Sequence, residues 1–380
     1  MKRPMKPTRL ARRLCQSVTL LVIVIGSAND GMAADLFVNP QAGNDGNSGS
    51  RSEPVATIQQ AIGMSRPGDT ISLLPKKSVY RQHFVLSGRS DLTIEGNGVT
   101  LEGADPLPES DWEEMPNKLF RRKLPRTAWD RHLLIIDGRT ERMRRTQSSN
   151  SPDFPKPSQL STGQFCFESI DDSSGWLYVR GKISSLEWAV RPNGLGTGGK
   201  NSNIIVRNLN ARHFLNDGFN IHGHAVGMKF ENIRGYDCFD EGFSAHDTCE
   251  CTIDTGVFYG NENAIADVND CVTHYRNCEF RDSVSVDVLL IGRKHSLTDC
   301  RIFNTTPAAA LTAGPRGEPV RSFGLRLERV VVEGRTDQAA RVRINGGSIE
   351  FVDCQFENAV VNTQGATLTT SQPESGEIKK

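Results

Sequence analysis

One short pattern recurs about once every two dozen residues through the second half of the chain. The unit reads apolar–x–apolar–x–x–apolar–x–apolar, and its strict and looser copies begin at Ile204, Met228, Cys251, Thr273, His295, Leu325 and Ile349. The steps between these positions are 24, 23, 22, 22, 30 and 24 residues. Apolar residues two apart have the spacing of a β-strand, and so short a unit cannot bury its apolar face unless neighbouring copies stack. The repeat therefore predicts a parallel β-helix with one coil per copy.

Cysteine spacing supports the register of these coils. Cys249 and Cys271 are 22 residues apart, and so are Cys278 and Cys300. Each pair should lie at the same point of successive coils, about 4.8 Å apart. That spacing is short enough for a disulfide, and the even number of cysteines left after removal of Cys15 with a signal peptide suits pairing. We favour the other interpretation, a ladder of small, buried, reduced thiols.

Length and charge bound the classes of function. At 380 residues the chain is too long for one compact core but natural for a solenoid. Lys plus Arg and Asp plus Glu both number 45, so the formal net charge is zero. This balance removes the electrostatic basis for general nucleic-acid binding, and we expect no nucleic-acid partner. The sequence leaves the oligomeric state open.

The N-terminus has the layout of an export signal. Basic residues dominate the first 13 positions, an apolar run follows at 18–25, and small residues lead up to Ala33 and Ala34. The layout predicts a signal peptide over 1–34 and a secreted or periplasmic protein. Because the apolar run is too short to cross a bilayer comfortably, we expect no membrane span after cleavage. An uncleaved anchor is the less favoured alternative.

Residues 35–103 are predicted to form an N-terminal cap and the first coils. A strand at 36–40, a polar turn at 43–50, a short amphipathic helix at 57–62 and a strand at 71–73 follow one another. The turn could hold calcium, although a flexible turn is favoured and no cofactor is required. This order resembles the N-terminus of the pectin-lyase-like right-handed β-helix proteins, in which a short helix plugs the open end of the barrel. The resemblance implies an all-β, right-handed parallel β-helix with an N-terminal capping helix.

The repeat is lost over 104–195, which we interpret as a β-rich insertion beside the helix. Strand-like pieces lie at 133–136, 165–167, 176–179 and 186–190. The insertion holds all four tryptophans, Trp112, Trp129, Trp176 and Trp188. They could stack on sugar rings, but we favour a small core of the insertion's own. Arg142, Arg144 and Arg145 could meet an acidic substrate, although a solvated basic face is favoured.

The coils are predicted to resume in the main helix, at 196–358, and to end before a polar tail at 359–380. Two consecutive coils carry matching polar segments at 216–222 and 240–246. Superposing Gly218 on Gly242 gives a step of 24 residues, which is one coil. In this register Phe219 and Phe243 point into the core, and Ile221 points inward beside them.

The alternate side chains of the same strands should then face outward on one sheet. His222 would stack over His246, and Asp217 would lie over Glu241 at the turn. Imidazoles in register beside carboxylates favour a functional site over a surface kept for solubility. We therefore take the following as candidate catalytic residues: Asp217, Asp240, Glu241, His222 and His246.

A second group of residues is predicted to bind substrate around these five. Its members are Asn220, Ser244, His224, Asp247, Asp267 and Arg276. The parity of 265–268 is open, and a slip of one residue would turn Asp267 from the outer to the inner face. A zinc site made by His222, His246 and an acid is also possible, and its ligand spacing comes from the inferred fold alone.

Polygalacturonases have an Asn-x-Asp turn followed one coil later by an acidic pair. Asn216-Asp217 and Asp240-Glu241 are similar to that arrangement, although here Asn and Asp are adjacent and the second acid is Glu. The similarity implies glycoside hydrolysis by two carboxylates, one as acid and one as base. We therefore predict hydrolysis of a polysaccharide, with His222 and His246 positioning the substrate.

Two alternatives remain open at this point. One is a lyase that acts by β-elimination on a uronic-acid polymer, in which His222 or His246 abstracts the C5 proton and Arg276 or bound calcium neutralises the carboxylate. The other is a non-catalytic module that binds a glycan or a surface. The residues do not identify the sugar or the linkage.

Overall fold

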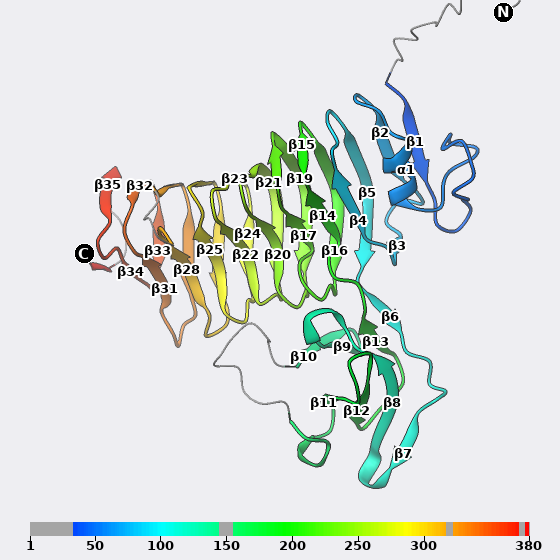
Figure 1. The fold of residues 1–380 in the computed structure, drawn as a ribbon. Helices are drawn as coiled ribbons and strands as arrows, with labels where there is room; N and C mark the ends of the chain where they lie inside the picture. Colours follow the sequence, from blue (N-terminus) through cyan, green and yellow to red (C-terminus); the bar gives the residue numbers. More distant parts are fainter. Residues whose placement is uncertain (1–32, 144–154, 317–321, 372–376, 380) are drawn as a thin grey trace, which may run out of the picture. The chain divides into compact units, whose positions relative to one another are not determined.

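The computed structural model describes residues 33–143, 155–316, 322–371 and 377–379. Within them the chain winds into a parallel β-solenoid of about 12 turns (Figure 1). The predicted fold class, an all-β right-handed parallel β-helix, is confirmed. The predicted signal peptide falls almost wholly on residues outside the description, as do Arg144 and Arg145. In the described ranges no helix is both long and apolar enough to cross a membrane.

Two long parallel sheets form the walls of the solenoid. Sheet 1 runs in the order β1 (Asp35–Val38), β2 (Thr70–Leu73), β5 (Thr93–Glu102), β16 (Ile205–Arg212), β19 (Met228–Tyr236), β21 (Glu250–Tyr259), β23 (Val272–Arg276), β26 (Lys294–Thr298), β29 (Gly324–Glu328), β32 (Ser348–Val352) and β35 (Thr367–Ser371). Its side branches are β3 (Val79–Tyr80), β24 (Glu279–Arg281), β27 (Arg301–Asn304), β30 (Val331–Gly334) and β33 (Gln355–Glu357).

Sheet 2 stacks one strand per coil beside sheet 1. Its strands are β4 (Phe84–Ser87), β14 (Leu195–Gly198), β17 (Phe219–Ile221), β20 (Glu241–Ala245), β22 (Asn263–Val268), β25 (Val286–Ile291), β28 (Ala309–Ala313), β31 (Ala340–Ile344), β34 (Ala359–Asn362) and β36 (Glu377–Lys379). A two-strand pair, β15 (Lys200–Ser202) with β18 (His224–Val226), lies at the turns. The coils thus continue past residue 358, where we expected a tail, because Ala359 and Val361 are buried in the same core.

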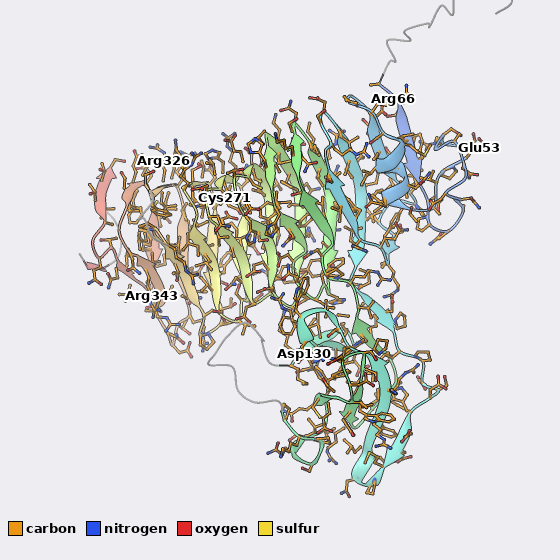
Figure 2. The ribbon with its side chains drawn as sticks, viewed as in Figure 1. Glu53, Arg66, Asp130, Cys271, Arg326 and Arg343 are labelled. Carbon is orange, nitrogen blue, oxygen red and sulfur yellow. The ribbon has the colours of Figure 1, made fainter. Side chains whose placement is uncertain are left out.

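The core is a stack of inward side chains, as the alternation predicted. Phe219 lies over Phe243 with ring centroids 6.3 Å apart, and Phe258 lies over Phe280 at 5.8 Å. Cys271 belongs to this buried column of side chains between the sheets (Figure 2). Repetition of one residue type at one point of each coil lets apolar surface be buried without a globular centre.

The buried thiols follow the same stacking rule. Cys278 and Cys300 lie in contact on successive coils as free thiols. Burial and this neighbouring thiol raise the pKa of Cys278 well above its usual value, so the group stays protonated. This matches the favoured interpretation of a reduced ladder, and thiol counting on the denatured, unreduced protein is the measurement that checks it.

Helix α1 (Ile58–Met64) covers the first coil, with Ile58, Ala61 and Ile62 buried (Figure 1). Thr57 caps its N-terminus by accepting a hydrogen bond from the Gln60 amide at 3.2 Å. Asp45, from the polar turn considered for calcium, accepts bonds from the Ala56 and Thr57 amides and from the Thr57 hydroxyl. Its carboxylate therefore docks the turn onto the start of the helix.

The insertion consists of two four-stranded antiparallel sheets. They contain β6 (Ala104–Pro106), β9 (Leu133–Ile136), β10 (Arg139–Arg142) and β13 (Leu186–Ala189), and β7 (Glu113–Met115), β8 (Leu119–Pro125), β11 (Phe165–Ser169) and β12 (Ser174–Arg180). Short 3-10 turns lie at Pro116–Lys118, Ala128–Asp130 and Pro157–Gln159. Trp188 is buried in the core of the insertion, and Trp112 and Trp176 pack against it. Three of the four tryptophans therefore build that core.

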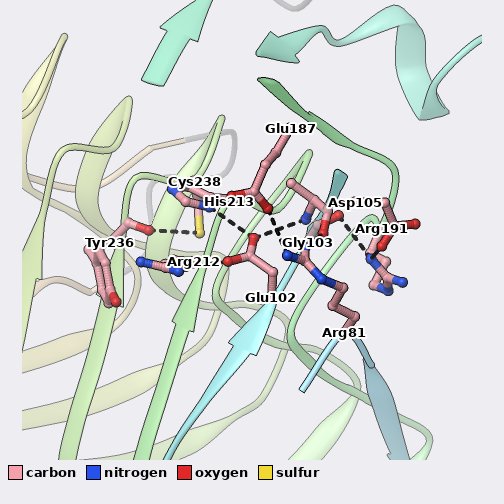
Figure 3. Close-up of polar contacts among 11 residues, drawn as sticks. Arg81, Glu102, Gly103, Asp105, Glu187, Arg191, Arg212, His213, Tyr236 and Cys238 are labelled. Carbon is pink, nitrogen blue, oxygen red and sulfur yellow. Dashed lines mark hydrogen bonds and ion pairs between the residues drawn. The ribbon is translucent and has the colours of Figure 1, made fainter. Parts of the chain in front are cut away.

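Ion pairs gather where the chain passes from the coils into the insertion (Figure 3), and Arg81, between β3 and β4, pairs there with Glu187 of β13 at 2.9 Å. Glu102, at the end of β5, is 1% exposed and bonds His213 and Arg212 at 2.8 Å each. Burial alone would raise the pKa of Glu102, but the bonds to His213 and Arg212 lower it below its usual value. Within the insertion, Arg191 pairs with Asp105 of β6 at 2.9 Å.

Arg142 makes a further contact that differs from our expectation of a solvated basic face. Its guanidinium donates to the main-chain oxygens of Cys238 and Gly260, which lie on two successive coils. Burial lowers the pKa of Arg142 from its usual value. The residue therefore ties β10 to the solenoid instead of facing a substrate.

Candidate active site

A cleft of about 750 Å³ lies against the outer face of sheet 2. Its floor comes from β17, β20, β22 and β25, and Trp129 and Arg131 reach it from the insertion. The lining residues are Trp129, Arg131, Asn216, Asp217, Asn220, His222, Asp240, Glu241, His246, Asn263, Ala266, Val268, Ser285, Val286, Leu289, Ile291 and Arg316. All five candidate catalytic residues thus border one cavity.

Three carboxyl groups meet at one end of this cleft. Asp217 precedes β17, and on the next coil Asp240 directly precedes β20, which begins at Glu241. One oxygen from each of the three lies within 4.8 Å of the others. The Glu241 amide donates to Asp217 at 3.1 Å, so the stacking of the two turns brings the acids together. The predicted placement of Asp217 over Glu241 is thus the arrangement observed.

Arg131 was not foreseen as part of this site, and it supplies the cluster with a cation. Its side chain is 1% exposed and pairs with Asp240 at 2.8 Å. It also donates to the Leu215 carbonyl at 3.2 Å and to the Asn216 side chain. A buried guanidinium beside a carboxylate favours the ionised form of that carboxylate. Arg131 stands 109 positions before Asp240 in the sequence, so no local pattern signals the pairing.

Glu241 has the opposite electrostatic environment. Burial, then the charges of Asp240 and Asp217, raise the pKa of Glu241 well above its usual value. Asn263 donates to its Oε1 at 2.7 Å from the next coil. The environment of Glu241 therefore favours its protonated form, while the ion pair with Arg131 favours the ionised form of Asp240. A protonated and an ionised carboxyl side by side are the two partners that acid–base catalysis needs.

Asp217 is held by side chains that we had assigned to substrate binding. Asn220 donates to Asp217, and the Ser244 hydroxyl donates to the same oxygen at 2.6 Å. Ser244 is fully buried and Asn220 is 9% exposed. Both side chains point to the outer face as predicted, but they are buried and leave little surface for a substrate to contact. Their observed contacts orient the Asp217 carboxylate.

The two histidines stack as the register predicted. The rings of His222 and His246 have centroids 4.0 Å apart and planes 13° from parallel. Asp247 accepts from the Gly223 amide at 2.8 Å and lies 3.3 Å from Nδ1 of His222. Burial, together with His222, lowers the pKa of His246 to about 4, so this imidazole is neutral near pH 7.

Of the six predicted substrate-binding residues, Asn220 lines the cleft, and the other five lie outside its lining: Ser244, His224, Asp247, Asp267 and Arg276. His224 is exposed on β18 and lies 2.9 Å from the Thr248 hydroxyl. Arg276 is exposed on β23, which belongs to sheet 1 and not to the sheet beneath the cleft. Asp267 points inward and is fully buried, because Ile265 and Asp267 face the core while Ala266 and Val268 face the cleft. The structure therefore decides the parity that the sequence left open at 265–268, and Asp267 faces inward.

Trp129 stands apart from the other tryptophans. It is 53% exposed, and the Arg131 guanidinium carbon lies 5.3 Å from the centre of its ring. Its backbone lies in the left-handed region at φ 54°, a strained conformation for a bulky residue. Such strain concentrates at functional sites, and an exposed indole at the edge of a polar cleft suits stacking on a sugar ring.

Metal binding has one geometric candidate in the part of the chain that the structure describes. That group of three or more possible ligands is Asp217, Asp240 and Glu241, and the two histidines are not members of it. Arg131 already neutralises Asp240, and Asn263 already bonds Glu241. Because the cluster already has this cation and this amide as partners, we draw no metal role from it.

Comparison with known proteins identifies the fold. No family of known proteins matches the chain, and no curated protein matches it. A solved structure described as XylC with xylose is 12% identical with a TM-score of 0.55, and the match covers 89% of this chain and 70% of that one. The pectate lyase Pel9A is 11% identical with a TM-score of 0.51, covering 91% of this chain and 80% of that one.

A third solved structure, described as a glycoside hydrolase, is 11% identical with a TM-score of 0.50. The match covers 91% of this chain and 96% of that one. The chain is therefore similar in fold to β-helix proteins of the pectate-lyase kind, as the resemblance at its N-terminus implied. At these identities the likeness establishes the fold, and the chemistry has to be argued from the cleft.

Proposed function

We propose that the protein is a carbohydrate-active enzyme that hydrolyses glycosidic bonds of a polysaccharide in this cleft. The observation that carries the proposal is the meeting of three carboxyl groups with unlike environments. Glu241 is buried among like charges, whereas Asp240 is paired with Arg131 at 2.8 Å. An acid and a base on either side of one bond are the requirement for glycoside hydrolysis.

The roles follow from the protonation of each group. Glu241 donates its proton to the glycosidic oxygen as the bond from that oxygen to the anomeric carbon breaks. Asp217 and Asp240 face the positive charge that develops on the sugar ring. One of these carboxylates then takes a proton from the water that attacks the anomeric carbon, or it bonds to that carbon itself to form a glycosyl-enzyme. In the second case water, deprotonated by Glu241, breaks the new bond and releases the sugar.

The rest of the cleft supplies binding contacts. Trp129 offers an exposed ring for stacking. His222 and His246, which directly follow β17 and β20, also line the cleft. Arg316 adds a cation where the chain leaves β28. The export signal predicted over 1–34 would deliver the enzyme to the periplasm or the exterior, where polysaccharides are found.

A digestion assay on a panel of polysaccharides tests the proposal. We expect one glycan to release reducing ends without the ultraviolet absorbance of an unsaturated product, and we expect Glu241→Gln to abolish the release. Phe243→Ala is the matched structural control, since this inward ring should lower the melting temperature instead. Absence of reducing ends across a broad panel would contradict the proposal.

β-Elimination is a second candidate, and His246 is the observation in its favour. This imidazole is neutral near pH 7 because burial lowers its pKa to about 4, and it lies in the cleft with Arg316. A neutral imidazole can accept the C5 proton of a uronate while a cation holds the carboxylate. Appearance of the unsaturated product, lost in His246→Ala and retained in Glu241→Gln, would establish this function in place of hydrolysis.

A further inference from the structure

The floor of the cleft changes from polar to aliphatic along the solenoid. Outer positions in one column are Asn220 on β17, Ser244 on β20, Ala266 on β22 and Leu289 on β25. In the parallel column His246 is followed by Val268 and Ile291, because Ala245 pairs with Asp267 and Val268 with Ile291. Both columns therefore lose their polar side chains at the same coil, next to the carboxyl cluster.

The aliphatic part is a bounded patch inside the cleft. It consists of Ala266, Val268, Leu289 and Ile291, which we call the apolar floor. Val268, Leu289 and Ile291 are partly exposed, because they lie on the outer face of the sheet. At about 4.8 Å per coil, two coils span about 10 Å, which is the length of one to two sugar units. Ser285 and Arg316, both exposed, also line the cleft, so the cleft as a whole is not apolar.

The four aliphatic side chains of this floor offer no hydrogen-bond partner to the hydroxyl groups of a sugar. Free hydroxyl groups turned toward aliphatic side chains lose their water partners and gain no hydrogen bond in return. Acetyl groups in place of those hydroxyls would instead bury methyl groups against the four side chains. A single deoxy methyl group would cover only a small part of a patch that spans two coils and two columns.

We infer that the cleft selects a polysaccharide whose sugar unit next to the cleaved bond is O-acetylated, with that unit bound on the apolar floor. The inference rests on the proposed function, because the glycan is taken to cross the carboxyl cluster. It adds the substrate class, an acetylated glycan chain, to the reaction. We place the acetylated unit on the apolar floor because the floor and the carboxyl cluster line the same cleft.

The test compares each acetylated polysaccharide of a panel with the same preparation after mild alkaline deacetylation. We expect at least about a tenfold higher kcat/KM on the acetylated form, a discrimination typical of an apolar pocket. Leu289→Asn should reduce the preference to about twofold or less, because it should lower kcat/KM on the acetylated form more than on the deacetylated form. Binding of both forms is measured in parallel by calorimetry.

Val85→Asn is the matched control. Val85 is an outward valine of sheet 2 in the same column, 42% exposed, and it lies outside the cleft. This variant should keep the full preference for the acetylated form. Hydrolysis with equal rates on both forms would overturn the inference and leave the proposed function standing. Tighter binding of the acetylated form without any cleavage would overturn hydrolysis and support the apolar floor. Equal loss on both forms in Leu289→Asn would also overturn the inference.

Discussion

A cluster of three buried carboxyls and a single buried carboxyl lie on neighbouring coils, and they differ in what they face. Asp217, Asp240 and Glu241 border the cleft and meet Arg131. Asp267 lies inside the solenoid, where its carboxyl group accepts bonds from the Thr273 and Tyr275 hydroxyls at 2.7 and 2.9 Å. We call Asp267 with these two hydroxyl groups the inner cluster, and the three acids with Arg131 the cleft cluster.

Burial raises the acid pKa in both places, to about 7 for Asp267 and well above the usual value for Glu241. A perturbed carboxyl is therefore not in itself a mark of catalysis in this protein. What distinguishes the cleft cluster is access for a ligand and an ionised partner beside the protonated acid. The inner cluster has hydroxyl donors and His295 around it, and these satisfy a buried polar group without creating an acid–base pair.

The largest expected difference between the clusters is catalytic. Glu241→Gln should lower kcat/KM by about 10²–10⁴-fold, because the proton donor is lost while the shape is kept. Asp267→Asn should leave kcat/KM within about twofold, because its side chain does not reach the cleft. Initial rates on the responsive glycan measure both. If Asp267→Asn inactivates the enzyme at unchanged melting temperature, the distinction between the clusters is wrong.

The cleft cluster contains a buried cation, Arg131, which has no counterpart in the inner cluster. Arg131→Met should destabilise the fold by about 3–5 kcal/mol, since it leaves the Asp240 charge buried without its partner. The double variant Arg131→Met with Asp240→Asn should recover part of that loss. Denaturant titration measures the stability, and a pH–rate profile of the single variant should be displaced from that of the wild type. An additive double variant would mean that the two groups do not interact.

The raised pKa of Asp267 should make the stability of the fold depend on pH. The folded pKa of Asp267 is raised to about 7 from the ordinary value of 3.8, so the folded state holds a proton that the unfolded state releases between those pH values. The wild type should therefore lose stability relative to Asp267→Asn as the pH rises from about 4 to about 7.

The nearby titratable groups do not alter this difference. Tyr275 stays protonated because burial raises its pKa, and His295, whose pKa burial lowers to about 3, is common to both proteins. Thermal denaturation of the pair at several pH values is the measurement. A constant gap in melting temperature across this range would show that Asp267 is ionised in the fold.

The smallest expected effect is a difference between His246 and His224, both of which were predicted from the sequence to belong to the site. His246→Ala should reduce kcat/KM by about tenfold, because it removes a cleft-lining ring that stacks on His222 at 4.0 Å. His224→Ala should change nothing measurable, since this exposed side chain lies outside the cleft lining. Equal effects of the two substitutions would mean that the substrate extends past the cleft to β18.

Much of the architecture could be predicted from the repeat. Residues two apart point to the same side of a strand, so Phe219 and Phe243 had to face the core once the coils were in register. The same argument stacked His222 over His246. It could not settle 265–268, where both parities place apolar residues inside, and it could not show that Asn220 would bond to Asp217.

The sequence by itself therefore determined the solenoid, its register and the strands that carry the acids, because these depend on a periodic pattern of apolar side chains that any short window reveals. Only the tertiary structure decided which acids meet a cation and which acid keeps its proton. Arg131 reaches Asp240 through the packing of the insertion, and the pKa of Glu241 is raised because two coils and their neighbours exclude water from it. Burial and charge depend on distances in space between residues that are far apart in the chain.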